Sequence, residues 1–280
     1  MTLTVPTRVG PLTVDVQGAD DQPTALLWHS LFVDSRTWQR TIPELVLDRR
    51  LIVVTGPGHG TSGDPGHRYT MEDCADAASD VLDAVGVTGQ VDWVGNAWGG
   101  HVGIVFAARH PTRLRTLVTA GTPVHGYTIP SRLQTLLLTL IYRALGPVPF
   151  ITDAVVEALL SERTRAGDEA AAEIVRDAFV RANRRAMTNA VISISLRRQN
   201  LLPVLPRVQV PTLFMTGTSH PDWSPGQMLA AVAHLPRGEA HVIDGPAYLV
   251  PLEAPADFTR DVRAFWAAHP ADARDTTSDR

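Results

Sequence analysis

Residues 91–101 of the chain read Val91-Asp92-Trp93-Val94-Gly95-Asn96-Ala97-Trp98-Gly99-Gly100-His101. The apolar run from Val91 to Val94 predicts a buried strand, and the glycines after it predict a sharp turn into a helix. Gly95 and Gly99 stand two residues before and two residues after Ala97. This spacing allows a strained turn that exposes one side chain above a sheet, and here that side chain is a methyl group that cannot act as a nucleophile.

Three further stretches place this turn in a wider pattern. An apolar strand ends at Trp28 and is followed by His29-Ser30-Leu31-Phe32, and a second strand precedes Pro57-Gly58-His59-Gly60-Thr61-Ser62. The third stretch is Leu249-Val250-Pro251-Leu252-Glu253-Ala254-Pro255. In this order and at these separations the four stretches resemble the α/β-hydrolase superfamily, in particular its lid-containing esterases, lactonases and epoxide hydrolases. The resemblance covers nearly the whole chain, whereas the glycine turn alone would also suit another doubly wound protein.

The resemblance implies a degenerate catalytic triad. Ala97 stands where the family has its nucleophilic serine, Tyr248 where it has the histidine, and His220 where it has the acid. Asp222, two residues further on, is a displaced candidate for the acid. Loss of one triad member already removes most serine-hydrolase activity, and the oxyanion hole and binding alone leave roughly a thousand- to ten-thousand-fold acceleration over water. Ordinary ester hydrolysis is therefore expected to be poor.

The resemblance also implies an oxyanion hole that survives these changes. Its donors would be the backbone N–H groups of Leu31 and Trp98, which do not depend on the altered side chains. His220 and Tyr248 would face one another over this hole and form a pair suited to acid–base catalysis. In the alternative interpretation, Tyr248 fills the space of the missing histidine and His220 is a solvated loop residue.

Other polar and aromatic residues are candidates for substrate contact. These candidates are His29, Ser30, Asn96, Asp222 and Trp223. Structural roles compete for several of them: His29 would fix its loop, and Asn96 would serve the turn before Ala97. Trp223, with Trp28 and Trp98, would supply flat apolar walls for a ring-containing ligand or would belong to the core. His101, on the helix after the turn, is expected in the core or at the pocket floor.

The expected fold class is α/β: a mostly parallel central sheet flanked by helices, with a helical lid inserted. Apolar runs predict six strands, at 25–28, 51–54, 91–94, 114–118, 212–215 and 240–243. Residues from Met71 to Val85 repeat at helical spacing and predict a helix that stops at Gly86. The predicted division is a first core part at 1–123, a helical lid at 124–205, a second core part at 206–270 and a disordered tail at 271–280.

Composition restricts the partners. The 280 residues carry a formal net charge of -4, from 25 basic and 29 acidic residues dispersed along the chain, which excludes the footprint of a nucleic-acid-binding protein. The single cysteine, Cys74, excludes an internal disulfide, and no cluster of ligand residues predicts a metal site. We expect a small-molecule substrate or ligand, no cofactor, no membrane contact, a homo-oligomer as an open possibility, and a cytoplasmic protein, because the start of the chain does not resemble a signal peptide.

Three functions remain open on the sequence. The first is a cofactor-independent enzyme that performs lyase, isomerase or cyclase chemistry on an apolar, carbonyl-containing small molecule. The second is a pseudoenzyme that binds a ligand without converting it. The third is an ester, lactone or epoxide hydrolase whose nucleophile has been replaced by Ala97.

Overall fold

An eight-stranded sheet forms the centre of the computed structural model, which describes residues 1–271. The strands lie in the order β1-β2-β4-β3-β5-β6-β7-β8. The pairs β1–β2 and β2–β4 are antiparallel, and all pairs from β4 to β8 are parallel. Their bounds are Thr2–Val5 (β1), Leu12–Gln17 (β2), Thr24–Trp28 (β3), Arg50–Thr55 (β4), Val91–Asn96 (β5), Leu114–Ala120 (β6), Thr212–Gly217 (β7) and Gly238–Ile243 (β8).

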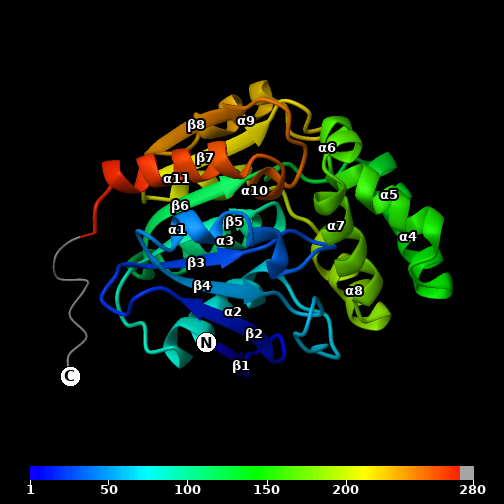
Figure 1. Cartoon of the computed structure of the whole chain (residues 1–280), viewed down its shortest axis with the longest axis horizontal. Coiled ribbons are helices and arrows are strands. Elements are labelled where there is room, and N and C mark those ends of the chain that lie inside the picture. The colour runs from blue at the N-terminus through cyan, green and yellow to red at the C-terminus, as the bar shows by residue number, and fades with distance from the viewer. Residues whose placement is uncertain (272–280) are drawn as a thin grey trace.

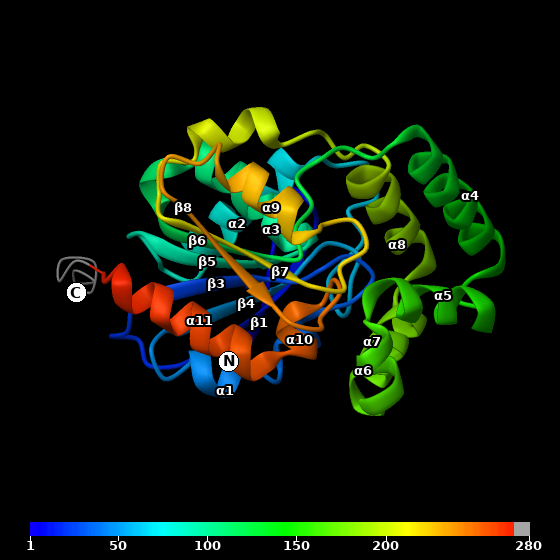
Figure 2. The ribbon, with the colours of Figure 1, turned by 90° about the horizontal axis from the view of Figure 1, so that it is seen from above.

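Helices cover both faces of the sheet (Figure 2). One face packs on α2 (Met71–Ala84), α3 (Trp98–Arg109) and α9 (Pro225–Val232), and the other packs on α1 (Ile42–Leu45) and α11 (Pro255–Ala268). Successive side chains of a strand point to opposite faces, so Leu26 and Trp28 join the first core while Ala25 and Leu27 join the second. This is why central strands such as β3 and β4 are apolar at nearly every position instead of at alternate ones.

A helical insertion separates β6 from β7 and lies beyond the carboxyl ends of the parallel strands (Figure 1). It contains α4 (Ile129–Leu145), α5 (Pro149–Leu159), α6 (Glu162–Gly167), α7 (Glu169–Arg181), α8 (Arg184–Ala190) and a π-helical turn, η3 (Val191–Ser195). Ion pairs fasten it to the core: the Arg36 guanidinium pairs with Asp177 of α7, and an Arg40 nitrogen lies 2.8 Å from an Asp168 oxygen.

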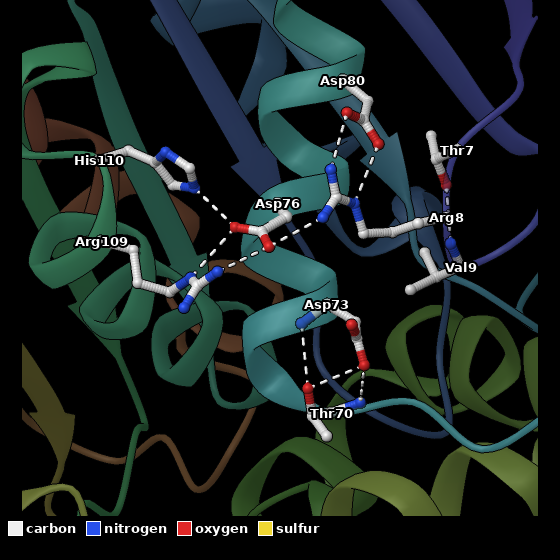
Figure 3. Close-up of polar contacts among 9 residues, drawn as sticks. All are labelled: Thr7, Arg8, Val9, Thr70, Asp73, Asp76, Asp80, Arg109 and His110. Atoms are coloured by element: carbon white, nitrogen blue, oxygen red, sulfur yellow. Dashed lines mark hydrogen bonds and ion pairs between the residues drawn. The ribbon is translucent and has the colours of Figure 1, made fainter.

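Asp76 of α2 links three parts of the core (Figure 3). Its carboxylate accepts hydrogen bonds from Arg8 at 2.9 Å, from Arg109 at 2.7 and 3.1 Å, and from His110 at 2.8 Å. Burial opposes ionisation of this carboxyl, but the hydrogen bonds from Arg109 and His110 outweigh it and hold its pKa below the usual value. The cluster therefore ties the N-terminal strand region and the end of α3 to α2.

All six strands predicted from apolar runs are present. The starts at Val91, Leu114 and Thr212 and the ends at Trp28 and Ile243 are as predicted, and every other strand end lies one or two residues beyond its prediction. The predicted helix from Met71 is α2, which Thr70 and Asp73 start with a reciprocal capping box. The antiparallel strands β1 and β2 were not predicted. Most of the tail predicted to be disordered, 271–280, lies outside the described residues. Within residues 1–271, no helix combines the length and apolar character needed to span a membrane.

Candidate active site

The turn between β5 and α3 has the strained geometry that its glycines predict. Ala97 has φ 47° and ψ -104°, a backbone conformation that residues with a side chain rarely adopt. A Cβ atom on Gly95 would lie 2.3 Å from the backbone of Gly99, and one on Gly99 would lie 1.9 Å from the Trp28 carbonyl oxygen. Only glycine fits at these two positions, and the result is that the Ala97 methyl group points into a cavity.

The cavity has a volume of about 350 Å³ and lies between the carboxyl ends of the strands and the helical insertion. Loops that follow parallel strands meet at this edge of the sheet, where open α/β folds place their ligands. Its wall is mostly apolar. From the core it is lined by Ser30, Leu31, Ala97, Trp98, Asp222 and Tyr248, and from the insertion by Tyr142, Ile151, Leu159, Phe179, Ile194 and Arg198, among others.

Leu31 and Trp98, whose backbone N–H groups are the predicted donors of an oxyanion hole, both line this cavity. Trp98 is the first residue of α3, so its N–H has no acceptor in the preceding turn, and Leu31 lies in the loop after β3. The loop and the helix are joined by a hydrogen bond of 3.1 Å from the Gly99 N–H to the His29 carbonyl. The N-terminus of α3, which is the positive end of its helix dipole, therefore lies directly after Ala97 at the cavity.

Two buried histidines fix this loop. The Gly56 N–H donates to His29 Nε2 at 2.8 Å, so Nδ1 carries the proton and donates to the Ser30 carbonyl at 2.6 Å. In the same way, the Phe32 N–H donates to His59 Nε2 at 3.3 Å. Burial lowers the pKa of His29 to about 4 and that of His59 to about 3, so both rings are neutral at physiological pH and act as parts of the scaffold.

Tyr248 follows β8 and projects into the cavity beside Asp222, which follows β7. The Tyr248 hydroxyl donates a short hydrogen bond to the Asp222 carboxylate. Burial, and then the hydrogen bond to Asp222, raise the pKa of the Tyr248 phenol well above its usual value. The phenol therefore keeps its proton at neutral pH.

His220 lies behind Tyr248 and does not line the cavity. The two ring centroids are 3.9 Å apart, and the Asp222 N–H donates to His220 Nδ1 at 3.2 Å. Burial lowers the pKa of His220 to about 4, and within residues 1–271 its Nε2 has no hydrogen-bond partner. The rings of His220 and Tyr248 are in contact, but His220 does not face the cavity as the sequence predicted, and the polar partner of Tyr248 is Asp222.

The structure places three predicted substrate contacts behind the cavity wall. The His29 ring is fully buried in its loop, and Trp223 is fully buried against His125. Asn96 ends β5, and its amide donates to the carbonyls of Ala120 and Tyr248 at 2.9 and 2.8 Å. These residues hold the loops instead of lining the cavity, since their polar atoms or rings face the protein interior.

Among the remaining predicted residues, Ser30 and Asp222 line the cavity, as does Trp98. Trp28 is fully buried beneath it, in edge contact with Trp98. His101 also lines the cavity and donates from Nε2 to the Pro123 carbonyl at 2.7 Å.

Two polar residues of the insertion were not predicted. Tyr142 and Arg198 both line the cavity, and within residues 1–271 the Tyr142 hydroxyl is buried without a hydrogen-bond partner. Burial raises the pKa of Tyr142 to about 12. The basic pair directly after the largely apolar run at 190–196 of the insertion was the available signal for Arg198.

Glu253, from the last stretch quoted from the sequence, joins the site to the insertion. Its two carboxylate oxygens accept from the Ala247 N–H and from the Ser161 N–H, both at 2.8 Å. The Tyr248 N–H in turn donates to the Leu159 carbonyl at 3.3 Å. The position of Tyr248 thus depends on the insertion as well as on the sheet.

Comparisons with known proteins agree with this architecture. Residues 23–248 match the family model described as alpha/beta hydrolase fold. Over 85 residues the chain is 40% identical to 2-hydroxymuconate semialdehyde hydrolase of Pseudomonas sp. (strain CF600), which is 30% of each chain. Over 59 residues it is 36% identical to cis-3-alkyl-4-alkyloxetan-2-one decarboxylase of Shewanella oneidensis, which is 21% of this chain and 19% of that one. The matches therefore span less than a third of these relatives.

A solved structure extends the likeness to the whole fold. The esterase of Thermogutta terrifontis superposes with a TM-score of 0.88 at 24% identity, covering 96% of this chain and all (100%) of the esterase. At this identity the likeness concerns the fold alone.

Proposed function

Because the chain belongs to the alpha/beta hydrolase fold family and carries a methyl group at its strained turn, we propose that it is a cofactor-independent enzyme with non-hydrolytic chemistry. Its substrate is an apolar small molecule with a carbonyl group, and the reaction is of the lyase, isomerase or cyclase type. The triad of the family is degenerate in this proposal, with Ala97, Tyr248 and His220 in its three places. The helical insertion acts as the lid.

One observation carries the proposal: the Tyr248 hydroxyl is hydrogen-bonded to the Asp222 carboxylate inside a cavity that Leu31 and Trp98 also line. In this proposal the backbone N–H groups of Leu31 and Trp98 are the donors of an oxyanion hole at the floor of the cavity. A carbonyl oxygen at this floor is polarised by the two donors, which stabilise negative charge as it develops. A proton on the neighbouring carbon then becomes acidic enough for a protein base to remove.

Tyr248 and Asp222 supply that base as a unit. The Tyr248 oxygen takes the proton from carbon while its own proton passes to an Asp222 oxygen, so the C–H bond breaks and the charge moves from the carboxylate to the enolate. The raised pKa of Tyr248 requires this coupling, because a free phenolate is scarce at neutral pH. The enolate then takes a proton back at another carbon, expels a leaving group or closes a ring, with Asp222 returning the proton through Tyr248.

His220 has a positioning role in this scheme. Its ring packs on that of Tyr248, and its Nδ1 holds the Asp222 backbone, so it fixes both partners without contacting the substrate. The name of one relative, a decarboxylase, is also consistent with a non-hydrolytic reaction on this fold.

Proton exchange tests the proposal without knowledge of the natural substrate. Apolar ketones and β-dicarbonyl compounds are incubated with the protein in heavy water, and NMR follows exchange at the carbon next to the carbonyl. We expect exchange that Tyr248→Phe and Asp222→Asn each slow by about a hundredfold or more, the usual contribution of a general base. Tyr69→Phe, which removes a buried phenol outside the cavity, should leave the rate unchanged.

A ligand-binding protein without turnover is the second candidate. The same hydrogen bond between Tyr248 and Asp222 favours it. A phenol that donates to a carboxylate and has a raised pKa keeps a fixed orientation and releases its proton poorly. In that case compounds bind in the cavity, no exchange occurs, and Tyr248→Phe changes affinity only.

A further inference from the structure

Arg198 is brought to the cavity by an unusual turn of the insertion. The π-helical turn η3 and the residues next to it place Val191, Ile194, Ser195 and Arg198 along one side of the chain, and all four line the cavity. π-helical turns occur mostly as single insertions within α-helices, frequently at functional sites. Arg198 is partly buried at this position.

The guanidinium of Arg198 has little compensation within the protein. Its central carbon lies 4.0 Å from the centroid of the Tyr127 ring, so one face of the group is covered. Its buried Nε has no hydrogen-bond partner within residues 1–271, and in that part of the chain it forms no ion pair with a carboxylate. By contrast, the buried Arg49 and Arg115 both pair with Asp92.

Arg198 also acts on the interior of the cavity electrostatically. Among the cavity-lining residues that the structure describes, it bears the positive charge and Asp222 the negative one. No ion pair joins Arg198 to Asp222 within residues 1–271, and the Asp222 carboxylate accepts the Tyr248 hydroxyl. After burial, the charge of Arg198 is the next cause that lowers the pKa of His101. The positive charge of Arg198 thus acts on a cavity-lining side chain, and no ion pair neutralises it within residues 1–271.

We propose that Arg198 is a specificity-determining residue that binds a carboxylate group of the ligand. The inference rests on the proposed function, since it names a second group on the same apolar, carbonyl-containing substrate. Tyr127 covers the face of the guanidinium and leaves its N–H edge for a planar acceptor, which a carboxylate matches with two parallel hydrogen bonds. One guanidinium balances one negative charge, which favours a carboxylate over a phosphate.

Packing against Tyr127 accounts for one face of the guanidinium and for none of its N–H groups. The contact with Tyr127 needs the face of the group and not its edge, and an unsatisfied buried donor is costly to keep. A bound carboxylate would satisfy the edge donors and neutralise the charge in one step. The ligand would then lie with its acid end at Arg198 and its carbonyl at the N–H groups of Leu31 and Trp98.

Octanoate and octanamide test the proposal as matched probes, since both carry the same chain and differ in charge. Calorimetry measures their affinities for the unmodified protein, for Arg198→Met and for the control Arg197→Met, which removes the neighbouring exposed arginine that does not line this cavity. We expect Arg198→Met to weaken octanoate by about tenfold or more and to change octanamide by less than about twofold. Arg197→Met should change neither, and added salt should weaken octanoate alone.

The outcomes separate this inference from the proposed function. If both probes bind but Arg198→Met leaves octanoate unchanged, or weakens both probes equally, Arg198 is not a carboxylate site and the apolar cavity still stands. If neither probe binds the folded protein, the proposed cavity function fails and this inference fails with it. A thermal melt of each variant checks that the substitution has not unfolded the chain.

Discussion

Replacing Ala97 by serine returns a hydroxyl to the strained turn, yet we expect almost no gain in ester hydrolysis. In a triad a histidine takes the proton of the serine and passes it to the leaving group, and here Tyr248 stands in the place that the family resemblance gives to that histidine. Tyr248 is bonded to Asp222 with a raised pKa, and His220, whose pKa is lowered to about 4 by burial, lies behind it. The substitution restores one of three parts that act as a unit.

The size of the missing effect follows from known triads. Removing the base of a serine hydrolase costs about two-million-fold in kcat, or about 8.6 kcal/mol in transition-state stabilisation. The substitution leaves the proposed backbone donors of Leu31 and Trp98 unchanged, so any contribution from them, roughly a thousand- to ten-thousand-fold over water in known triads, is common to both proteins. Ala97→Ser should therefore change hydrolysis of an activated ester by less than about tenfold.

Release of nitrophenol from a p-nitrophenyl ester measures the rate, and a fluorophosphonate label followed by intact-protein mass spectrometry reports whether the new hydroxyl is activated. We expect slow release and no label. A gain of roughly ten-thousand-fold with labelling would refute the reasoning. It would show that the site holds a base that activates the hydroxyl introduced by Ala97→Ser. Combining Ala97→Ser with His220→Ala would reveal whether His220 is that base.

Three further predictions concern the scaffold. Gly99→Ala should cost about 3 kcal/mol or more in the free energy of unfolding by urea, because its Cβ would lie 1.9 Å from the Trp28 carbonyl, whereas the control Gly226→Ala, with no atom within 4 Å, should not destabilise. Asp76→Asn should lower the free energy of unfolding by about 2 kcal/mol at neutral pH. Because the folded-state pKa of Asp76 is lowered, its contribution is present above the unfolded pKa of about 3.9 and is lost as the pH falls through the folded value. Urea melts of the two proteins should therefore converge in acid. Arg40→Met breaks an ion pair between the core and the insertion, so amide hydrogen exchange should become faster in the insertion and not in the sheet. Unchanged exchange of the insertion in the variant would contradict that anchoring.

The fold was largely predictable because its constraints are local. The glycines around Ala97 follow from close backbone approach, and the apolar runs follow from a sheet covered on both faces. The antiparallel strands β1 and β2 carry a weaker signal, since one is mostly exposed and short. Their pairing depends on contacts across the sheet that no single stretch of sequence reveals.

The sequence indicates which residues line the cavity better than it indicates which side chains bond to one another. Ala97, Tyr248 and Asp222, which the sequence singled out, line the cavity. The direction of each ring was not predicted, because the burial of His220 and the bond from Tyr248 to Asp222 depend on loops from two different strands. Arg198 was missed because its exposure to the cavity results from the packing of the insertion.

The most direct test of non-hydrolytic chemistry is untargeted mass spectrometry of a metabolite extract from the source organism, incubated with the protein in water enriched in the heavy oxygen isotope. The Tyr248→Phe variant is the matched control. We predict a product formed by the unmodified protein alone, with its mass unchanged or reduced by a small molecule, and without heavy oxygen. A product that gains one labelled water would contradict the account and restore a hydrolase, and a compound retained but never converted would make the chain a binding protein.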